Sequence, residues 1–291
     1  MPVLADYQNG NCRIVIFDDG TKTRSWPDGE VACVVTPESI DLKITDYCDA
    51  GCAFCHESST KRGEIASLHE ILRVLKGLPA GTEIAIGGGN PLSHPNIYDI
   101  LVACCKQGLI ANLTVNALHI NSSTIRFINM CRQKEILYGV GISYHPECKD
   151  ALALIVDNNS IVHVIAGVHS VHEILKLPAS YKILVLGYKN YGFGSKYLLT
   201  KPVNFILGAW QYHLTRFLTN RRLICFDNLA LEQLNVKGLL SPEQWQTHYM
   251  GDDGKFTMYC DCVKRCYAAS STQKRIPYGD ADIVEMFRLL L

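Results

Sequence analysis

Short apolar segments alternate along the chain with longer segments in which apolar residues recur every three to four positions. The first pattern predicts β-strands and the second predicts amphipathic helices. Seven such strands are predicted, at residues 39–45, 83–86, 111–116, 138–143, 161–165, 182–186 and 223–226. The helices between them are predicted to begin near residues 68, 96, 122, 170 and 202.

Three of these helices have recognisable starts. Ser67 with Glu70 and Ser170 with Glu173 have the spacing of capping boxes. The third helix begins beside Ser122 and Ser123, either of which can cap it.

Strands that alternate with helices indicate βαβ units and therefore a parallel sheet. The predicted strands are apolar throughout, which fits a sheet that is covered on both faces. Six or seven units with right-handed crossovers curl into a full or partial barrel, with the carboxyl ends of the strands at one rim. We therefore expect an α/β fold, a partial (β/α)6 TIM-like barrel.

The two ends of the chain depart from this alternation. Residues 13–17 and 21–26 predict a hairpin before the barrel. Past residue 228 we expect a short helix from 241 and a second hairpin over residues 256–269. The predicted organisation is an N-terminal hairpin extension at 1–38, a core barrel at 39–228 and a C-terminal cap at 229–291.

Composition places the chain among folded globular proteins, with 48% hydrophobic and 19% charged residues in a total of 291. Basic and acidic residues are equal in number, 28 each, which argues against a nucleic-acid partner. No apolar run has the length of a membrane span, and the first ten residues lack the features of a secretory signal. We expect a cytoplasmic protein without membrane contact.

The chain has 13 cysteines, and most of them are expected to be reduced core residues. Cys48, Cys52 and Cys55 differ because they lie on one predicted loop directly after the first barrel strand. Three thiolates at this spacing can hold three irons of a cubane and leave the fourth iron open. The alternatives are a zinc site with His56 as a fourth ligand, and plain structural cysteines.

This segment resembles the radical S-adenosylmethionine (SAM) superfamily in its cysteine spacing, in Phe54 before the third cysteine and in its place after the first strand. The resemblance covers residues 39–227. It implies a [4Fe–4S] cluster on the three cysteines and reductive cleavage of SAM. The resulting 5′-deoxyadenosyl radical would abstract hydrogen from a substrate. A flavodoxin or ferredoxin would donate the electron.

The resemblance also implies a SAM site at the other strand ends. Phe54 would pack against the ligand, and the run Gly88, Gly89, Asn90 matches a Gly-Gly-Glu segment that holds the SAM amino group, with Asn90 in place of the acid. The ribose, carboxylate and adenine would contact Asn116, Ser143, Ile165 and Leu186. The alternatives are a simple glycine turn and structural caps. Five further polar groups at strand ends could serve a substrate: His145, His169, Lys189, Asp227 and Asn228.

The tail contains Cys260, Cys262 and Cys266, which could bind a second iron–sulfur cluster or pack as core cysteines. Its surroundings resemble the tails of uncharacterised radical SAM proteins. The substrate is either a peptide or protein gripped by residues 252–272, or a nucleoside or other small molecule within the barrel. A non-catalytic zinc or iron–sulfur module is the alternative to an enzyme.

Overall fold

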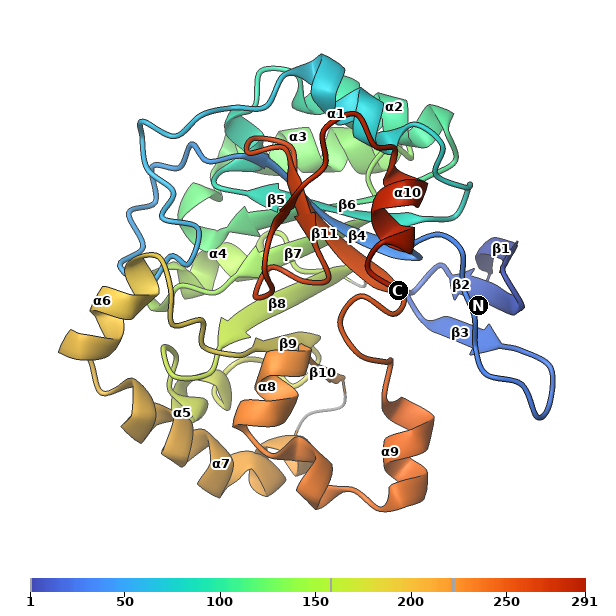
Figure 1. Cartoon of the computed structure of the whole chain (residues 1–291). Helices are drawn as coiled ribbons and strands as arrows, with labels where there is room; N and C mark the ends of the chain where they lie inside the picture. Colours follow the sequence, from blue (N-terminus) through green and yellow to red (C-terminus); the bar gives the residue numbers. More distant parts are fainter. Residues whose placement is uncertain (1, 158, 221–222) are drawn as a thin grey trace.

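The computed structural model describes residues 2–157, 159–220 and 223–291 (Figure 1). The seven predicted barrel strands are all present and parallel, and they lie side by side in chain order. They are β4 (Ser39–Thr45), β5 (Glu83–Gly88), β6 (Ile110–Asn116), β7 (Gly139–Ser143), β8 (Ser160–Ile165), β9 (Ile183–Leu186) and β10 (Ile224–Phe226). The sheet is curved and open, with β10 at one edge, which confirms a partial barrel.

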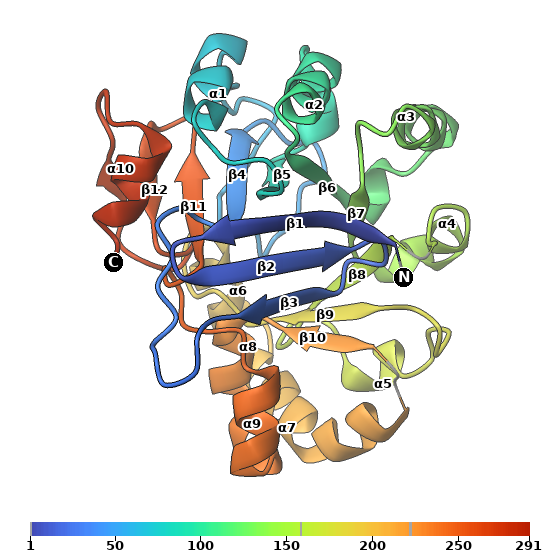
Figure 2. The ribbon, with the colours of Figure 1, turned by 90° about the vertical axis from the view of Figure 1, so that its right-hand side faces the viewer.

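Helices surround the strands on the outside, as Figure 2 shows. They are α1 (Leu68–Leu75), α2 (Ile97–Lys106), α3 (Ser122–Gln133), α4 (Lys149–Ala153), α5 (Val171–Ile174), α6 (Phe193–Thr200) and α7 (Val203–Asn220). The C-terminal part adds α8 (Asn228–Gln233), α9 (Pro242–His248) and α10 (Ile283–Arg288). None of the helices in the described ranges is long and apolar enough to cross a membrane.

The helix caps agree in part with the prediction. Ser67 caps α1, and its hydroxyl accepts a hydrogen bond from the Glu70 amide. For α3 the cap is Asn121 instead of either serine, because its side-chain oxygen accepts from two amides of the first turn. Ser170 precedes α5 but makes no side-chain cap hydrogen bond.

The predicted N-terminal hairpin is present as β2 (Cys12–Phe17) and β3 (Lys22–Ser25), and β1 (Val3–Asn9) adds a third strand that the sequence did not indicate. This sheet lies across one end of the barrel (Figure 2). Lys182, just before β9, donates to the Asp19 carbonyl over 2.8 Å. Lys22 pairs with Glu83, the first residue of β5. The extension therefore covers the amino ends of the strands and leaves the carboxyl ends uncovered.

The C-terminal hairpin joins the barrel sheet. Its first strand, β11 (Thr257–Asp261), pairs in parallel with β4, and β12 (Cys266–Ala268) and β13 (Ile276–Pro277) continue the sheet beyond it. A segment more than two hundred residues from β4 thus completes the wall beside the first strand. The boundaries at 38 and 228 stay predictions.

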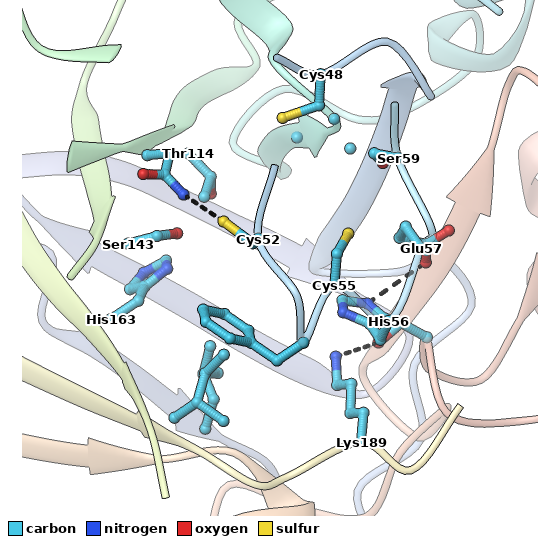
Figure 3. Close-up of a pocket in the computed structure, with 18 of the residues that line it drawn as sticks. Cys48, Cys52, Cys55, His56, Glu57, Ser59, Thr114, Ser143, His163 and Lys189 are labelled. Carbon is cyan, nitrogen blue, oxygen red and sulfur yellow. Dashed lines mark hydrogen bonds and ion pairs between the residues drawn. The ribbon is translucent and has the colours of Figure 1, made fainter. Parts of the chain in front are cut away.

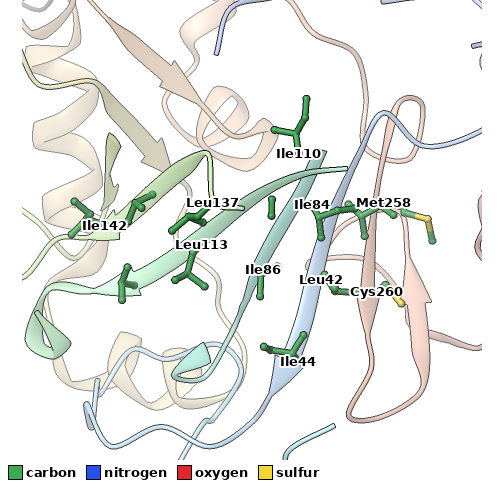
Figure 4. Packing of buried hydrophobic residues seen from close by; sticks show 14 of the residues in the cluster. Leu42, Ile44, Ile84, Ile86, Ile110, Leu113, Leu137, Ile142, Met258 and Cys260 are labelled. Carbon is green, nitrogen blue, oxygen red and sulfur yellow. The ribbon is translucent and has the colours of Figure 1, made fainter. Parts of the chain in front are cut away.

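The two faces of the barrel strands differ in chemistry. Alternate residues such as Leu42, Ile84 and Leu113 are fully buried against the helices and form the core (Figure 4). The residues between them point to the inside of the barrel and include small or polar ones, such as Asp41 and Thr114, beside the apolar Ile165 and Leu186. The expectation of strands that are apolar throughout was therefore wrong for the inner face. That face lines a cavity instead of a packed core.

Candidate functional site

The loop that carries the cysteine triad, residues 46–66, folds back on itself after β4. Backbone hydrogen bonds join Asp46 to Glu64 over 2.7 Å and Cys48 to Thr60 over 2.9 Å. Gly51 turns the chain with φ +68°, a backbone region that favours glycine. The amide of Phe193, at the start of α6, donates to the Cys55 carbonyl over 2.9 Å. The loop is thus fixed both internally and against α6.

Cys48, Cys52 and Cys55 are all half-buried and line one cavity at the carboxyl ends of the strands (Figure 3). Burial raises the pKa values of the Cys48 and Cys52 thiols, and the neighbouring thiols raise them further. The side-chain amide of Asn116 donates to Sγ of Cys52 over 3.5 Å. The structure therefore brings the predicted triad together around one space, with a hydrogen-bond donor beside its middle sulfur.

The cavity has a volume of about 290 Å³. Its wall is built from the cysteine loop, from the inner faces of β4 to β9, and from Tyr259 and Ser271 of the C-terminal part. Seven of the eight residues that the resemblance assigned to SAM line it: Phe54, Gly88, Gly89, Asn116, Ser143, Ile165 and Leu186.

The glycine run is required by the close approach of two backbones. Gly88 has φ +116°, and a Cβ there would come within 2.4 Å of the Thr45 carbonyl oxygen. A Cβ on Gly89 would lie 2.1 Å from the Tyr47 carbonyl oxygen. Any larger residue would separate this run from the cysteine loop. The glycines therefore bring a bare backbone edge to the cavity, next to the thiols.

Asn90 does not line the cavity. Its side chain is buried, and its oxygen caps a short 3₁₀ helix by accepting from the Leu92 amide over 3.2 Å. Its own amide donates to the Tyr47 carbonyl over 2.6 Å. The observed role of Asn90 is to fix the turn that follows the glycines.

Aromatic rings close the side of the cavity next to Phe54. The Phe54 ring meets His169 edge-on at 6.1 Å and Tyr197 at 5.7 Å between ring centroids. Nδ1 of His169 accepts from the Ile165 amide over 2.9 Å, and burial lowers the pKa of His169 to about 4. His169 is therefore a neutral wall residue.

Of the other polar groups considered at strand ends, Lys189 also lines the cavity, and its ammonium donates to the Ser271 hydroxyl over 2.7 Å. Asp227 caps α8 and also accepts from the Gly187 amide. Asn228 binds Asp253, and His145 caps a 3₁₀ turn. These last three do not line the cavity.

A buried ionic cluster beneath the cysteine loop is absent from the sequence prediction. Lys43 contacts Asp46 and Glu57 over 2.5 Å each and Asp261 over 3.1 Å. Arg275 bridges Glu57 and Asp261 over 2.7 and 2.8 Å. Burial of Glu57 opposes the charge of its carboxylate. The positive charge of Lys43 outweighs this effect and lowers the pKa of Glu57 to about 2. The cluster ties the loop to β11 and to the C-terminal segment.

His56, the fourth ligand of the zinc alternative, faces this ionic cluster. Its Nε2 lies 3.4 Å from the Glu57 carboxylate, and its ring meets Tyr191 edge-on at 5.7 Å. Burial lowers the pKa of His56 to about 3. Within the ranges the structure describes, no three His, Cys, Asp or Glu side chains converge as ligands of a single ion.

The three tail cysteines are buried away from the cavity. Cys260 lies on β11, Cys262 directly follows that strand, and both belong to the hydrophobic core, as Figure 4 shows for Cys260. Cys266 pairs directly with Asp261 and therefore lies on the other face of the hairpin. The convergence of all three sulfurs, which a second cluster would need, is not supported by this register.

Comparison with known proteins adds independent observations. The sequence model of the radical SAM superfamily matches residues 42–179. Streptococcus suis SuiB bound to its precursor peptide SuiA superposes with a TM-score of 0.57 at 14% identity, over 88% of this chain and 65% of SuiB. The SuiB structure bound to S-adenosylmethionine gives 0.56 at 16% identity, over 88% of this chain and 66% of that one.

A third structure, native anSMEcpe with bound AdoMet, gives a TM-score of 0.56 at 15% identity, over 87% of this chain and 80% of that one. At these identities the similarity establishes a shared fold. The chain spans about two thirds of the length of SuiB. No curated protein sequence matches it.

Proposed function

Because this chain belongs to the radical SAM superfamily, we propose that it is an enzyme that binds a [4Fe–4S] cluster through Cys48, Cys52 and Cys55. With SAM bound, the cluster supplies reductive cleavage of the cofactor to a 5′-deoxyadenosyl radical, which abstracts hydrogen from the substrate. The observation that carries the proposal is the meeting of three loop thiols and a bare glycine edge at one cavity.

The donor set fits an iron–sulfur cubane. Thiolates are the usual ligands of such clusters, and each holds a different iron, so that three leave one iron free. The three cysteines come from one short loop and border the cavity, where a free iron would be accessible to a ligand. His56 also lines the cavity, but its Nε2 turns toward the Glu57 carboxylate, and this contact competes with a role as a fourth ligand.

The remaining wall suits SAM in chemical terms. The backbone edge at Gly88 and Gly89 offers carbonyl groups that can accept from an ammonium. Asn116 and Ser143 offer polar side chains for ribose and carboxylate oxygens. Ile165 and Leu186 offer apolar surface for adenine. Phe54 and its aromatic neighbours keep water from this side of the cavity.

We propose a peptide or protein as the substrate, with a nucleoside or other small molecule as the second candidate. Support for the first comes from the fold, since SuiB is seen with its precursor peptide SuiA and anSMEcpe with the Cp18Cys peptide. A flavodoxin or ferredoxin is the proposed electron donor. Thirteen cysteines in the chain suit a reducing compartment, and we propose the cytoplasm.

The test is SAM cleavage by protein reconstituted anaerobically with iron and sulfide. With dithionite and SAM, the wild type should release 5′-deoxyadenosine, and Cys52→Ala should release none. Cys105→Ala is the matched control, because Cys105 is exposed on α2, outside the cavity wall, and should behave as the wild type does. A wild type that binds a cluster but yields no 5′-deoxyadenosine would favour the non-catalytic iron–sulfur module.

A further inference from the structure

Asp41 places a carboxylate inside the barrel, below the cysteine loop. It lies in the middle of β4, opposite Ala85 of β5 and Tyr259 of β11. Because strand side chains alternate, Leu42 points into the helix-covered core while Asp41 points inward and lines the cavity. Asp41 therefore shares the space that the thiols border, on the strand that leads to them.

The Asp41 carboxylate makes no hydrogen bond or ion pair with any other residue in the described parts of the chain. The other acids nearby are engaged. Glu57 is held by Lys43 and Arg275. Asp227 accepts from two backbone amides. The Asp41 side chain is exposed within the cavity, so a ligand that enters the cavity can reach its carboxylate.

The charge around Asp41 favours a cation in the adjoining space. Desolvation by the surrounding protein raises the pKa of Asp41 although its side chain is open to the cavity. Lys189 opposes this shift, and the carboxylates of Asp227 and Asp253 add to it. Asp41, Asp227 and Asp253 therefore have one nearby positive charge, the ammonium of Lys189. That ammonium also donates a hydrogen bond to the Ser271 hydroxyl over 2.7 Å. A cation that entered the cavity would be drawn to this acidic side.

Three other basic residues of the cavity wall do not provide a free positive charge for Asp41. Lys43 is committed to three carboxylates of the ionic cluster. Burial lowers the pKa values of His163 and His169 to about 4, so both rings are neutral near pH 7. Thr114 and Ser143 contribute uncharged hydroxyls.

We propose that Asp41 is a specificity-determining residue that binds a cationic group of the substrate, a protonated amine or a guanidinium. This proposal rests on the proposed function, in which the iron–sulfur cluster and SAM occupy the rest of the cavity. The cation forms a charge-assisted hydrogen bond with Asp41 and holds the substrate on the β4 side, below the thiols. Two kinds of substrate carry such a cationic group: a peptide with a lysine or arginine side chain, and a free amine.

The experiment measures binding to the reconstituted, SAM-loaded protein without reductant, by isothermal titration calorimetry. Three probes are compared: N-acetyl-lysine methylamide, its uncharged norleucine counterpart, and pentylamine. The lysine probe should bind the wild type about tenfold more tightly than the norleucine probe, or better, because a hydrogen bond to a charged group is lost in the latter. Asp41→Asn should bind the two probes about equally.

If pentylamine binds more tightly than the lysine probe, the cationic group belongs to a free amine. If the lysine probe binds more tightly, the cationic group is a basic side chain of a peptide. The proposal is overturned if the norleucine probe binds as well as the lysine probe, if no cationic probe binds, or if Asp41→Asn keeps the preference.

Thr114→Val is the matched control, since it changes a polar residue of the same wall without changing charge. It should shift the affinities of the lysine and norleucine probes by the same factor, and a loss of preference there would also overturn the proposal. Iron content near that of the wild type establishes that Asp41→Asn is folded. Absence of 5′-deoxyadenosine in the wild-type assay is a separate outcome, which refutes the proposed function and leaves the charge preference measurable.

Discussion

The side-chain amide of Asn116 at the end of β6 donates a hydrogen bond to Sγ of Cys52 over 3.5 Å. The oxygen of the same amide accepts from the Leu118 backbone over 3.0 Å, which fixes the amide with its nitrogen toward the sulfur. The end of β6, which β5 separates from β4, is thereby coupled to the middle cysteine of the loop. Donors at a ligand sulfur stabilise the reduced form of an iron–sulfur cluster.

Asn116→Ala should therefore lower the reduction potential of the cluster. One neutral hydrogen bond of about 0.5–1.5 kcal/mol corresponds to roughly 20–60 mV for one electron. An EPR-monitored redox titration measures the shift. Asn112→Ala is the control, because Asn112 lies on the same strand but binds the Gly139 amide. Equal potentials for wild type and Asn116→Ala would show that the hydrogen bond does not act on the cluster.

Asp261→Asn should destabilise the chain strongly. Asp261 is fully buried and pairs with Lys43 and Arg275, so neutralising it leaves part of a buried positive charge without compensation. Breaking such a pair costs about 3 kcal/mol. Asp6→Asn removes an exposed pair with Arg13 and should cost far less stability, because surface ion pairs are screened by solvent. Urea unfolding measures both, and similar losses would mean that the buried cluster adds no stability.

His163 should make the stability depend on pH below neutrality. Burial lowers its pKa from 6.5 to about 4. Between these values the unfolded chain takes up a proton that the folded chain cannot, so stability falls as the pH drops through this window and is complete above it. His163→Gln removes this contribution, roughly 1–3 kcal/mol. Urea unfolding at several pH values should give a shallower slope for the variant, and parallel slopes would contradict the assignment.

Cys262→Ala should leave the iron content of reconstituted protein at the wild-type value, since Cys262 is a core residue directly after β11. The change should cost stability, by about 1 kcal/mol. Iron and sulfide are measured in Cys262→Ala and in Cys52→Ala in parallel, which compares the loss of a core cysteine with the loss of a cluster ligand. A fall to half of the wild-type iron would instead reveal a second cluster in the tail.

The sequence predicts well what depends on local pattern. The seven barrel strands follow from short apolar runs, and the cysteine loop follows from its place after the first of them. The Ser67 cap was predicted because capping is a contact within one turn. Asn121 was missed as the cap of α3 because neighbouring serines are equally suited to that role.

The remaining features depend on contacts between distant segments. The pairing of β11 with β4 joins residues more than two hundred positions apart, and no local pattern indicates it. The inward direction of Asp41 could have been read from the alternation of β4, but its lack of a partner depends on the whole barrel. The face that Cys266 occupies depends on the register of the hairpin, which no local pattern gives.

The most direct test of the account is Mössbauer spectroscopy of wild-type protein reconstituted with isotopically enriched iron, with and without SAM. A cubane held by Cys48, Cys52 and Cys55 should show one iron site in four whose signal changes when SAM is added. Four equivalent irons that ignore SAM, or a preparation that holds no iron–sulfur cluster, would contradict the central claim.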